Sequence, residues 1–125
     1  MIEKALGIVA TELNNIGVPY EFVRWTSTVE DRYWVGEFAE TPTYTEDGYE
    51  ESTLLLTGTT RSSWLSLMQD REKIKDHFPK ISGLRTPTDN GAVVIFYDNA
   101  LPVPTDEADL KRIQINLQIK AWKGN

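Results

Sequence analysis

The clearest hydrophobic pattern lies near the C-terminal end of the chain, where every second residue is apolar. Ile113, Ile115, Leu117, Ile119 and Ala121 alternate with Gln114, Asn116, Gln118, Lys120 and Trp122. A period of two is typical of a strand with one buried face and one wet face, whereas a helix would scatter these apolar residues around its circumference. The stretch from Asp109 to Trp122 therefore predicts a long antiparallel strand around which the rest of the chain is organised.

The N-terminal residues 2–16 have a different pattern, with apolar residues three or four positions apart. This spacing predicts an amphipathic helix whose apolar stripe packs on the sheet. Gly17 is the expected C-terminal stop, and Pro19 makes continuation of the helix unfavourable. The polar side has only Lys4 as a basic residue, whereas helices that lie on membranes are usually basic, so core packing is the favoured interpretation.

A second helix is predicted over residues 64–78, with Ser62 or Ser63 as its N-cap and Pro79 as its end. The residues expected on its buried face are Trp64, Leu67, Met68, Arg71, Ile74 and Phe78. The charged residues expected to face mostly outward are Asp70, Glu72, Lys73, Lys75 and Asp76. Asp70 with Lys73, and Glu72 with Lys75, are opposite-charge pairs at helical spacing.

Four further stretches are rich in branched and aromatic residues and predict strands: residues 20–27, 32–39, 51–60 and 92–98. Gly36, in the middle of the second of these, suggests a bulge or a close approach of another group to the backbone. Aromatic residues occur on both faces of the first two strands, which suggests cover by a helix or by another subunit.

Residues 40–50, 80–91 and 99–109 have the proline, glycine and aspartate content of loops. An alternative for the first loop is an extended hairpin with Asp47-Gly48 at its tip. The resulting order is α-β-β-β-α-β-β. It predicts one α+β domain, residues 1–125, with a mainly antiparallel sheet and two helices packed on one face.

Composition excludes several functions. The chain has a net charge of −6 and no cysteine. Acidity disfavours nucleic acid as the main partner because phosphate affinity depends on clustered lysine and arginine, so we expect no sequence-specific nucleic acid. Absence of cysteine excludes disulfides and zinc–thiolate sites. No apolar run approaches the ~20 residues of a membrane span, and we expect no membrane partner, metal or cofactor.

The sequence has no recognisable set of catalytic groups. His77 is the only histidine and has no cysteine to activate and no second histidine for a metal site. The only concentration of carboxylates is Glu46, Asp47, Glu50 and Glu51, which lacks the spaced oxygen ligands of a calcium loop. We therefore expect a protein that is not an enzyme.

Several segments of the sequence resemble a known protein family. They are the helix that ends at Gly17-Val18-Pro19, the strand YEFVRW, the loop TYTEDGYEES and the segment TRSSWLSLMQDREKIKDHFP. Together they resemble small virion proteins of tailed bacteriophages and prophages. The nearest group is the tail terminator, or tail-completion, family, with the head–tail joining proteins as neighbours. The resemblance covers nearly the whole chain and rests on size, element order and these phrases.

The resemblance implies an α+β fold and a homo-oligomeric ring, commonly a hexamer, that caps the tail tube and binds other virion tail or neck proteins. It implies a location in the virion after assembly in the cytoplasm of the bacterial host. By position, the projecting family loops correspond to Thr41 to Glu51 and to Lys80 to Gly91. Because aromatic residues are enriched at interface hot spots, we hypothesise a subunit contact at Trp34, Phe38 and Trp122. The hypothesised partner-facing loop contains Glu46, Asp47, Glu50 and Glu51, whose charge would steer docking.

Two other functions stay open. One is a small ligand-binding or enzymatic α+β domain with a pocket between sheet and helices, for which Arg24, Glu37 or Arg71 is the expected buried polar group. The other is a cellular interaction module that binds a protein through its sheet edge.

Overall fold

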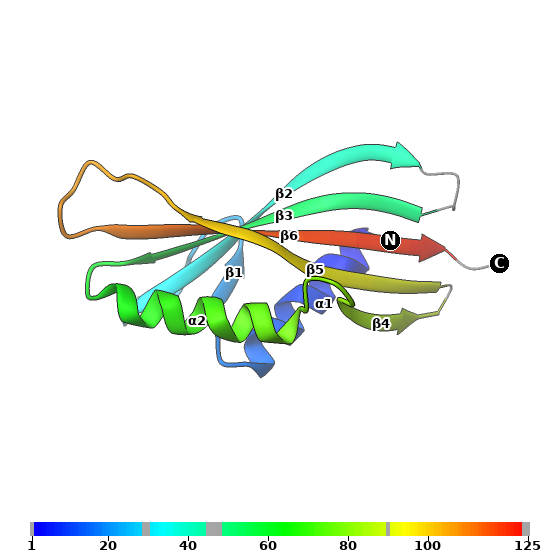
Figure 1. The fold of residues 1–125 in the computed structure, drawn as a ribbon, viewed down its shortest axis with the longest axis horizontal. Coiled ribbons are helices and arrows are strands. Elements are labelled where there is room, and N and C mark those ends of the chain that lie inside the picture. Colours follow the sequence, from blue (N-terminus) through cyan, green and yellow to red (C-terminus); the bar gives the residue numbers. More distant parts are fainter. Residues whose placement is uncertain (1, 29–30, 45–48, 90, 124–125) are drawn as a thin grey trace.

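The computed structural model describes residues 2–28, 31–44, 49–89 and 91–123, in which six strands form one sheet and two helices cover one of its faces (Figure 1). The helices are α1 (Ile2–Asn15) and α2 (Trp64–His77). The strands are β1 (Tyr20–Phe22), β2 (Arg32–Tyr44), β3 (Tyr49–Thr60), β4 (Leu84–Thr88), β5 (Gly91–Pro102) and β6 (Lys111–Lys123). Their order across the sheet is β1-β2-β3-β6-β5-β4, and only β1 and β2 pair in parallel. The predicted α+β class is confirmed.

The structure has one strand more than predicted after α2. The predicted loop 80–91 contains β4, which pairs with β5 from Leu84 opposite Ile95 to Thr88 opposite Gly91. Its sequence, LRTPT, reads as a loop because Pro87 cannot donate a backbone hydrogen bond. An edge strand tolerates such a residue, since only one of its sides is paired. Strand β5 also continues to Pro102, so the predicted loop 99–109 is shorter than expected.

The alternative of an extended hairpin between β2 and β3 is confirmed for the described residues. The two strands are paired from Arg32 opposite Thr60 to Tyr44 opposite Glu50. Most of the predicted loop 40–50 is therefore strand, and the turn Asp47-Gly48 lies outside the described residues. Strand β1, by contrast, is much shorter than the predicted 20–27.

Both helices end where the sequence predicts. After α1, Val18 N donates to Leu13 O and Gly17 N donates to Asn14 O, with Gly17 at φ 79°. These two bonds form a Schellman motif, which requires a left-handed residue and so favours glycine. At the start of α2, the Ser63 side chain accepts a hydrogen bond from Leu65 N, so Ser63 is the N-cap.

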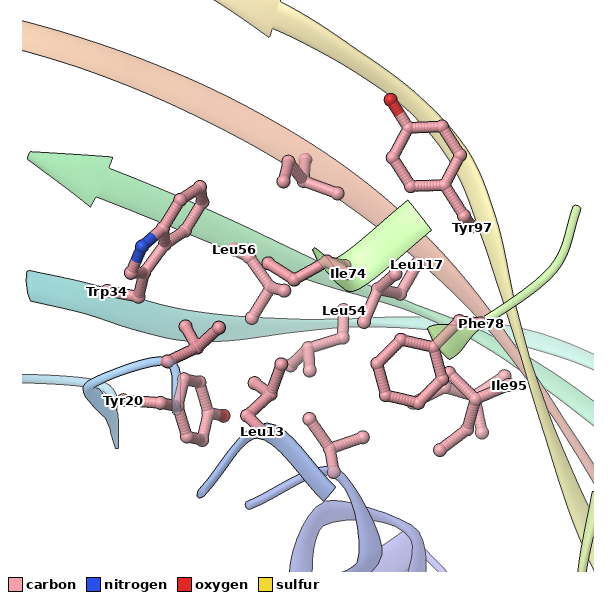
Figure 2. Close-up of a cluster of buried hydrophobic side chains, with 14 of the residues drawn as sticks. Leu13, Tyr20, Trp34, Leu54, Leu56, Ile74, Phe78, Ile95, Tyr97 and Leu117 are labelled. Carbon is pink, nitrogen blue, oxygen red and sulfur yellow. The ribbon is translucent and has the colours of Figure 1, made fainter. Parts of the chain in front are cut away.

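The core lies between the helices and one face of the sheet. Figure 2 shows Trp34 and Tyr20 at one end of this cluster, and Phe78 and Ile95 at the other. The apolar residues of the C-terminal alternation, Ile113, Ile115, Leu117, Ile119 and Ala121, are all buried there. The close approach predicted at Gly36 is also present: a Cβ atom on Gly36 would clash with the Tyr20 ring and hydroxyl.

Candidate interaction surfaces

A charged cluster is buried between α2 and the start of β2. Asp70 is 0% exposed, and its carboxylate accepts hydrogen bonds from Arg32 Nε at 2.6 Å, Arg32 Nη2 at 3.0 Å and Trp34 Nε1 at 2.8 Å. The hydrogen bond and the charge of Asp70 raise the pKa of Arg32 above its ordinary value. Because the carboxylate is satisfied by protein donors on an adjacent strand, it holds α2 on the sheet.

This cluster corrects two sequence predictions. Trp34 was assigned to a subunit contact, but its side chain is 0% exposed and its ring covers Gly58, so it has no surface to offer a second subunit. Asp70 was expected to face outward, yet it lies on the buried face of α2 with Leu67 and Ile74. The signal was present in the sequence, since Asp70 is three residues after Leu67 and four before Ile74. A buried indole N–H also needs an acceptor.

The three residues proposed as buried polar groups of a ligand pocket do not meet between the sheet and the helices. Arg24 and Glu37 are exposed. Arg71 is half-buried and its Nη2 donates to Glu72 Oε1 at 2.6 Å. His77 Nε2 lies 2.6 Å from Glu12 Oε2 and thereby joins α2 to α1.

The opposite face of the sheet carries an aromatic group around Lys120. Tyr49 and Trp122 are cross-strand partners whose ring centroids are 5.0 Å apart. Lys120 Nζ lies 5.2 Å from the ring centroid of Tyr49 and 5.5 Å from that of Phe96, and 3.6 Å from Glu51 Oε1. These five residues are termed the Lys120 cluster. All are half-buried, so aromatic area and the Lys120–Glu51 ion pair are partly accessible on this face.

The other hypothesised contact residues do not lie together in the structure. Trp122 belongs to the Lys120 cluster. Phe38 packs against the core while lying on β2 opposite Leu54. Glu51 faces the open side of the sheet, whereas Glu50, its neighbour in β3, points to the helix-covered side because successive strand residues alternate. Glu46 and Asp47 lie outside the described residues. The sequence did not single out Tyr49 or Phe96, because their proximity to Lys120 depends on strand register.

A groove with a volume of about 660 Å³ lies at the other end of the open face, between β2, β3 and the segment before β6. Tyr33, Thr59 and Arg112 line it and also line an adjoining cavity of about 350 Å³. Arg112 Nε donates to Thr59 Oγ1 at 3.3 Å, and Tyr33 stacks on Trp25 with ring centroids 5.5 Å apart. The groove combines an aromatic wall, hydroxyl groups, the Arg112 guanidinium and the carboxylate of Asp31, which accepts a hydrogen bond from Ser62 Oγ at 2.7 Å.

The second arginine of this groove is already neutralised. Arg61 Nη1 lies 2.6 Å from Glu107 Oε2 and 3.1 Å from Asp109 Oδ2. Hydrogen bonds to Glu107 and then to Asp109 raise the pKa of Arg61 above its ordinary value. These exposed pairs tie the end of β3 to the segment before β6, and Arg112 is left as the cation that faces the groove.

Among residues 2–28, 31–44, 49–89 and 91–123, no group of three or more histidine, cysteine, aspartate or glutamate side chains is arranged to hold a metal ion. Within the same ranges, no helix is long and apolar enough to cross a membrane. No protein-family model matches the sequence, and no curated protein matches it.

Proposed function

We propose that the protein is a structural virion component of a tailed bacteriophage or prophage, of the tail terminator or tail-completion type. Copies form a ring at the tail end, and the ring docks to neighbouring head–tail proteins. The protein is not an enzyme in this proposal, and it acts only through the shape and contacts of the ring. Tail polymerisation stops because the exposed face of the ring does not match the next tube subunit.

The observation that carries the proposal is the Lys120 cluster on a face of the sheet that no described helix covers. Aromatic side chains and a lysine at the free end of the β2–β3 hairpin give a contact surface with apolar area and charge. In Figure 1 the end of β2 and the start of β3 extend away from α2, which supports their use in docking. The resemblance of the sequence phrases supplies the phage context.

The Lys120 cluster can be tested by reversing its charge. Lys120→Glu places a carboxylate beside Glu51 and removes the cation from the Tyr49 and Phe96 rings, so we expect docking to tail tubes to fall by at least about tenfold. Lys73→Glu, on the exposed side of α2, makes the same charge change on the other side of the molecule and should leave docking unchanged. Co-sedimentation with assembled tubes measures docking, and circular dichroism confirms that both variants fold.

Ring formation is tested separately, by light scattering and negative-stain electron microscopy of the purified protein with and without tail tubes. We expect rings whose mass is a multiple of 14.2 kDa. Phage without the functional protein should make tails that lack a defined length. A protein that stays monomeric under both conditions, and whose loss leaves tail length unchanged, would contradict the proposal.

A second candidate function, binding of a small anionic molecule, is favoured by the groove beside Arg112. Its volume is in the ~300–1,000 Å³ range of ligand sites, and Arg112 has no carboxylate partner among the described residues. Saturable quenching of the intrinsic tryptophan fluorescence by one anionic ligand, lost in Arg112→Gln, together with a strictly monomeric protein, would favour this function over the ring.

A further inference from the structure

The sheet has an uncovered edge on the β2 side. Strand β1 pairs only with Trp34, Val35 and Gly36, and the last bond across this edge is from Val23 N to Gly36 O at 2.9 Å. Beyond that bond, no described strand lies on the outer side of β2 from Glu37 to Tyr44. Unpaired N–H and C=O groups on such an edge are a template for another strand.

The chain leaves this edge through a sharp turn. Arg24 N donates to Phe22 O at 2.8 Å, and Val23 between them has φ 70°. A hydrogen bond to the second residue back defines a γ-turn, and a positive φ is unfavourable for a β-branched residue. The turn ends β1 after three residues. It also leaves Phe22 43% exposed and Val23 61% exposed beside the uncovered section of β2.

The opposite edge is formed by β4, whose outer side has no strand within the part of the chain that the structure describes. Just before β4, Gly83 N donates to Pro79 O at 2.8 Å and closes a turn. Ile81 at this turn is 94% exposed, which is the highest value among the exposed large hydrophobic residues of the described chain. Both edges therefore carry apolar side chains that the monomer leaves in water.

Strand β4 and the uncovered section of β2 occupy the same position along the strand direction, on opposite edges of the sheet. Following the paired residues across it, Leu84 is level with Ile95, Ile119, Ser52 and Glu40. Strand β4 is thus level with the uncovered section of β2. The turn that holds Ile81 comes directly before Leu84, and Phe22 pairs with Gly36 directly before Glu37. Because Leu84 is level with Glu40, Phe22 lies four positions before the start of β4 along the strand direction, and Ile81 is three residues before Leu84 in the chain. Figure 1 shows β2 and β4 at opposite margins, with their arrows in the same direction.

We propose that copies of this chain join edge to edge, with β4 of one copy lying parallel to residues 37–44 of β2 in the next, and Ile81 packing on Phe22 and Val23. The inference deepens the proposed ring by naming its subunit contact. Since β2 and β4 run in the same direction, a sideways repeat of the molecule pairs them in parallel and continues the sheet from copy to copy.

Charge favours this head-to-tail contact over a symmetric dimer. Glu37 on β2 and Arg85 on β4 are both exposed on the open face, and neither has an ion-pair partner in the described ranges. In the level pairing Arg85 is opposite Thr41, four positions beyond Glu37, so β2 with β4 brings unlike charges to one interface without placing them directly opposite each other. A contact of β2 with β2, or of β4 with β4, would bring like charges to the interface. A contact between two different patches can repeat from copy to copy. The copies close into a ring when the rotation between neighbouring copies is a whole fraction of a full turn.

The absence of cysteine from the natural sequence allows a clean disulfide test. The full chain carrying both Val23→Cys and Ile81→Cys is oxidised and separated under denaturing, non-reducing conditions. We expect a ladder in steps of 14.2 kDa that ends at the ring size. Each single variant alone should give no ladder, and a mixture of the two should give only dimers, formed more than about tenfold faster than by random collision.

The possible results of the cross-linking test distinguish failure of the proposed edge contact from failure of the proposed ring. Dimers from one single variant alone, as fast as from the mixture, would show a symmetric contact and overturn the inference. No cross-linking in the double variant while microscopy shows rings would overturn the edge contact and leave the ring. No association by any measurement would overturn both.

A second pair of variants tests the apolar part of the contact without cysteine chemistry. Ile81→Asp should lower ring assembly by at least about tenfold, because it places a charge on the apolar surface of Phe22 and Val23. Leu65→Asp makes the same change at a residue of α2 that is 63% exposed and lies on neither edge, and assembly should be unchanged. Equal assembly by both variants would contradict the packing of Ile81.

Discussion

The two faces of the sheet are built from the same strands and differ in how their side chains are stabilised. On β6, Ile115 and Leu117 are buried under the helices, while Gln114 and Asn116 beside them stay partly in water. The covered face gains free energy from removal of apolar area, at about 25 cal/mol per Å². The open face relies on lateral contacts such as Tyr49 with Trp122, which contribute roughly 0.2–1 kcal/mol each. Truncation of a side chain should therefore lower the free energy of unfolding more on the covered face than on the open face.

The largest effect is expected at Asp70, whose carboxylate is buried between α2 and the sheet. Asp70→Ala leaves Arg32 and the Trp34 indole N–H without their acceptor, so the free energy of unfolding should fall by about 3–5 kcal/mol. Urea denaturation followed by fluorescence measures it. Asp76→Ala, an exposed residue of the same helix, should change stability by less than about 0.5 kcal/mol. Similar losses in both variants would show that the Asp70 cluster is not what holds α2.

A pH-dependent effect is expected at Tyr20, also on the covered face. Burial raises the pKa of Tyr20 to about 12 from 10.0. The folded protein therefore holds this proton more tightly than the unfolded chain. This difference contributes about 2–3 kcal/mol to the free energy of unfolding. The contribution is fully present below about pH 10 and is lost as the pH rises toward about 12.

Tyr20→Phe keeps the ring over Gly36 and removes the titrating group. Its hydroxyl has no hydrogen-bond partner among the described residues, so stability near neutral pH should change by less than about 1 kcal/mol. Between about pH 10 and 12 the variant should lose less stability than the natural protein, by the 2–3 kcal/mol given above. Tyr33→Phe on the open face is the control, and an identical alkaline response of all three proteins would count against burial of Tyr20.

The smallest effect is expected on the open face. Trp122→Ala removes the ring contact with Tyr49 and should lower the free energy of unfolding by about 0.5–1.5 kcal/mol. Leu117→Ala, on the covered face of the same strand, should cost about 2–5 kcal/mol. Thermal denaturation of the two variants makes the comparison directly. Equal losses would mean that the open face also contributes a packed core, and the difference between the faces would disappear.

The sequence predicted the features that depend on neighbouring residues. The alternation in β6, the Gly17 end of α1 and the Ser63 cap of α2 each follow from local spacing and local hydrogen bonds. It missed β4, because pairing with β5 overrides the loop composition of LRTPT. It also assigned Trp34 to a surface, since amino-acid type alone does not tell a core tryptophan from an interface one.

By itself the sequence determined the α+β class, the helix boundaries and which residues of β6 face the core, because these follow from periodicity within a single element. Only the tertiary structure decided which side chains from distant segments meet: Asp70 with Arg32, Lys120 with Tyr49 and Phe96, and the level edges of β2 and β4. The physical reason is strand register. A shift of one residue reverses the face of every side chain, and register is fixed by the packing of the whole sheet.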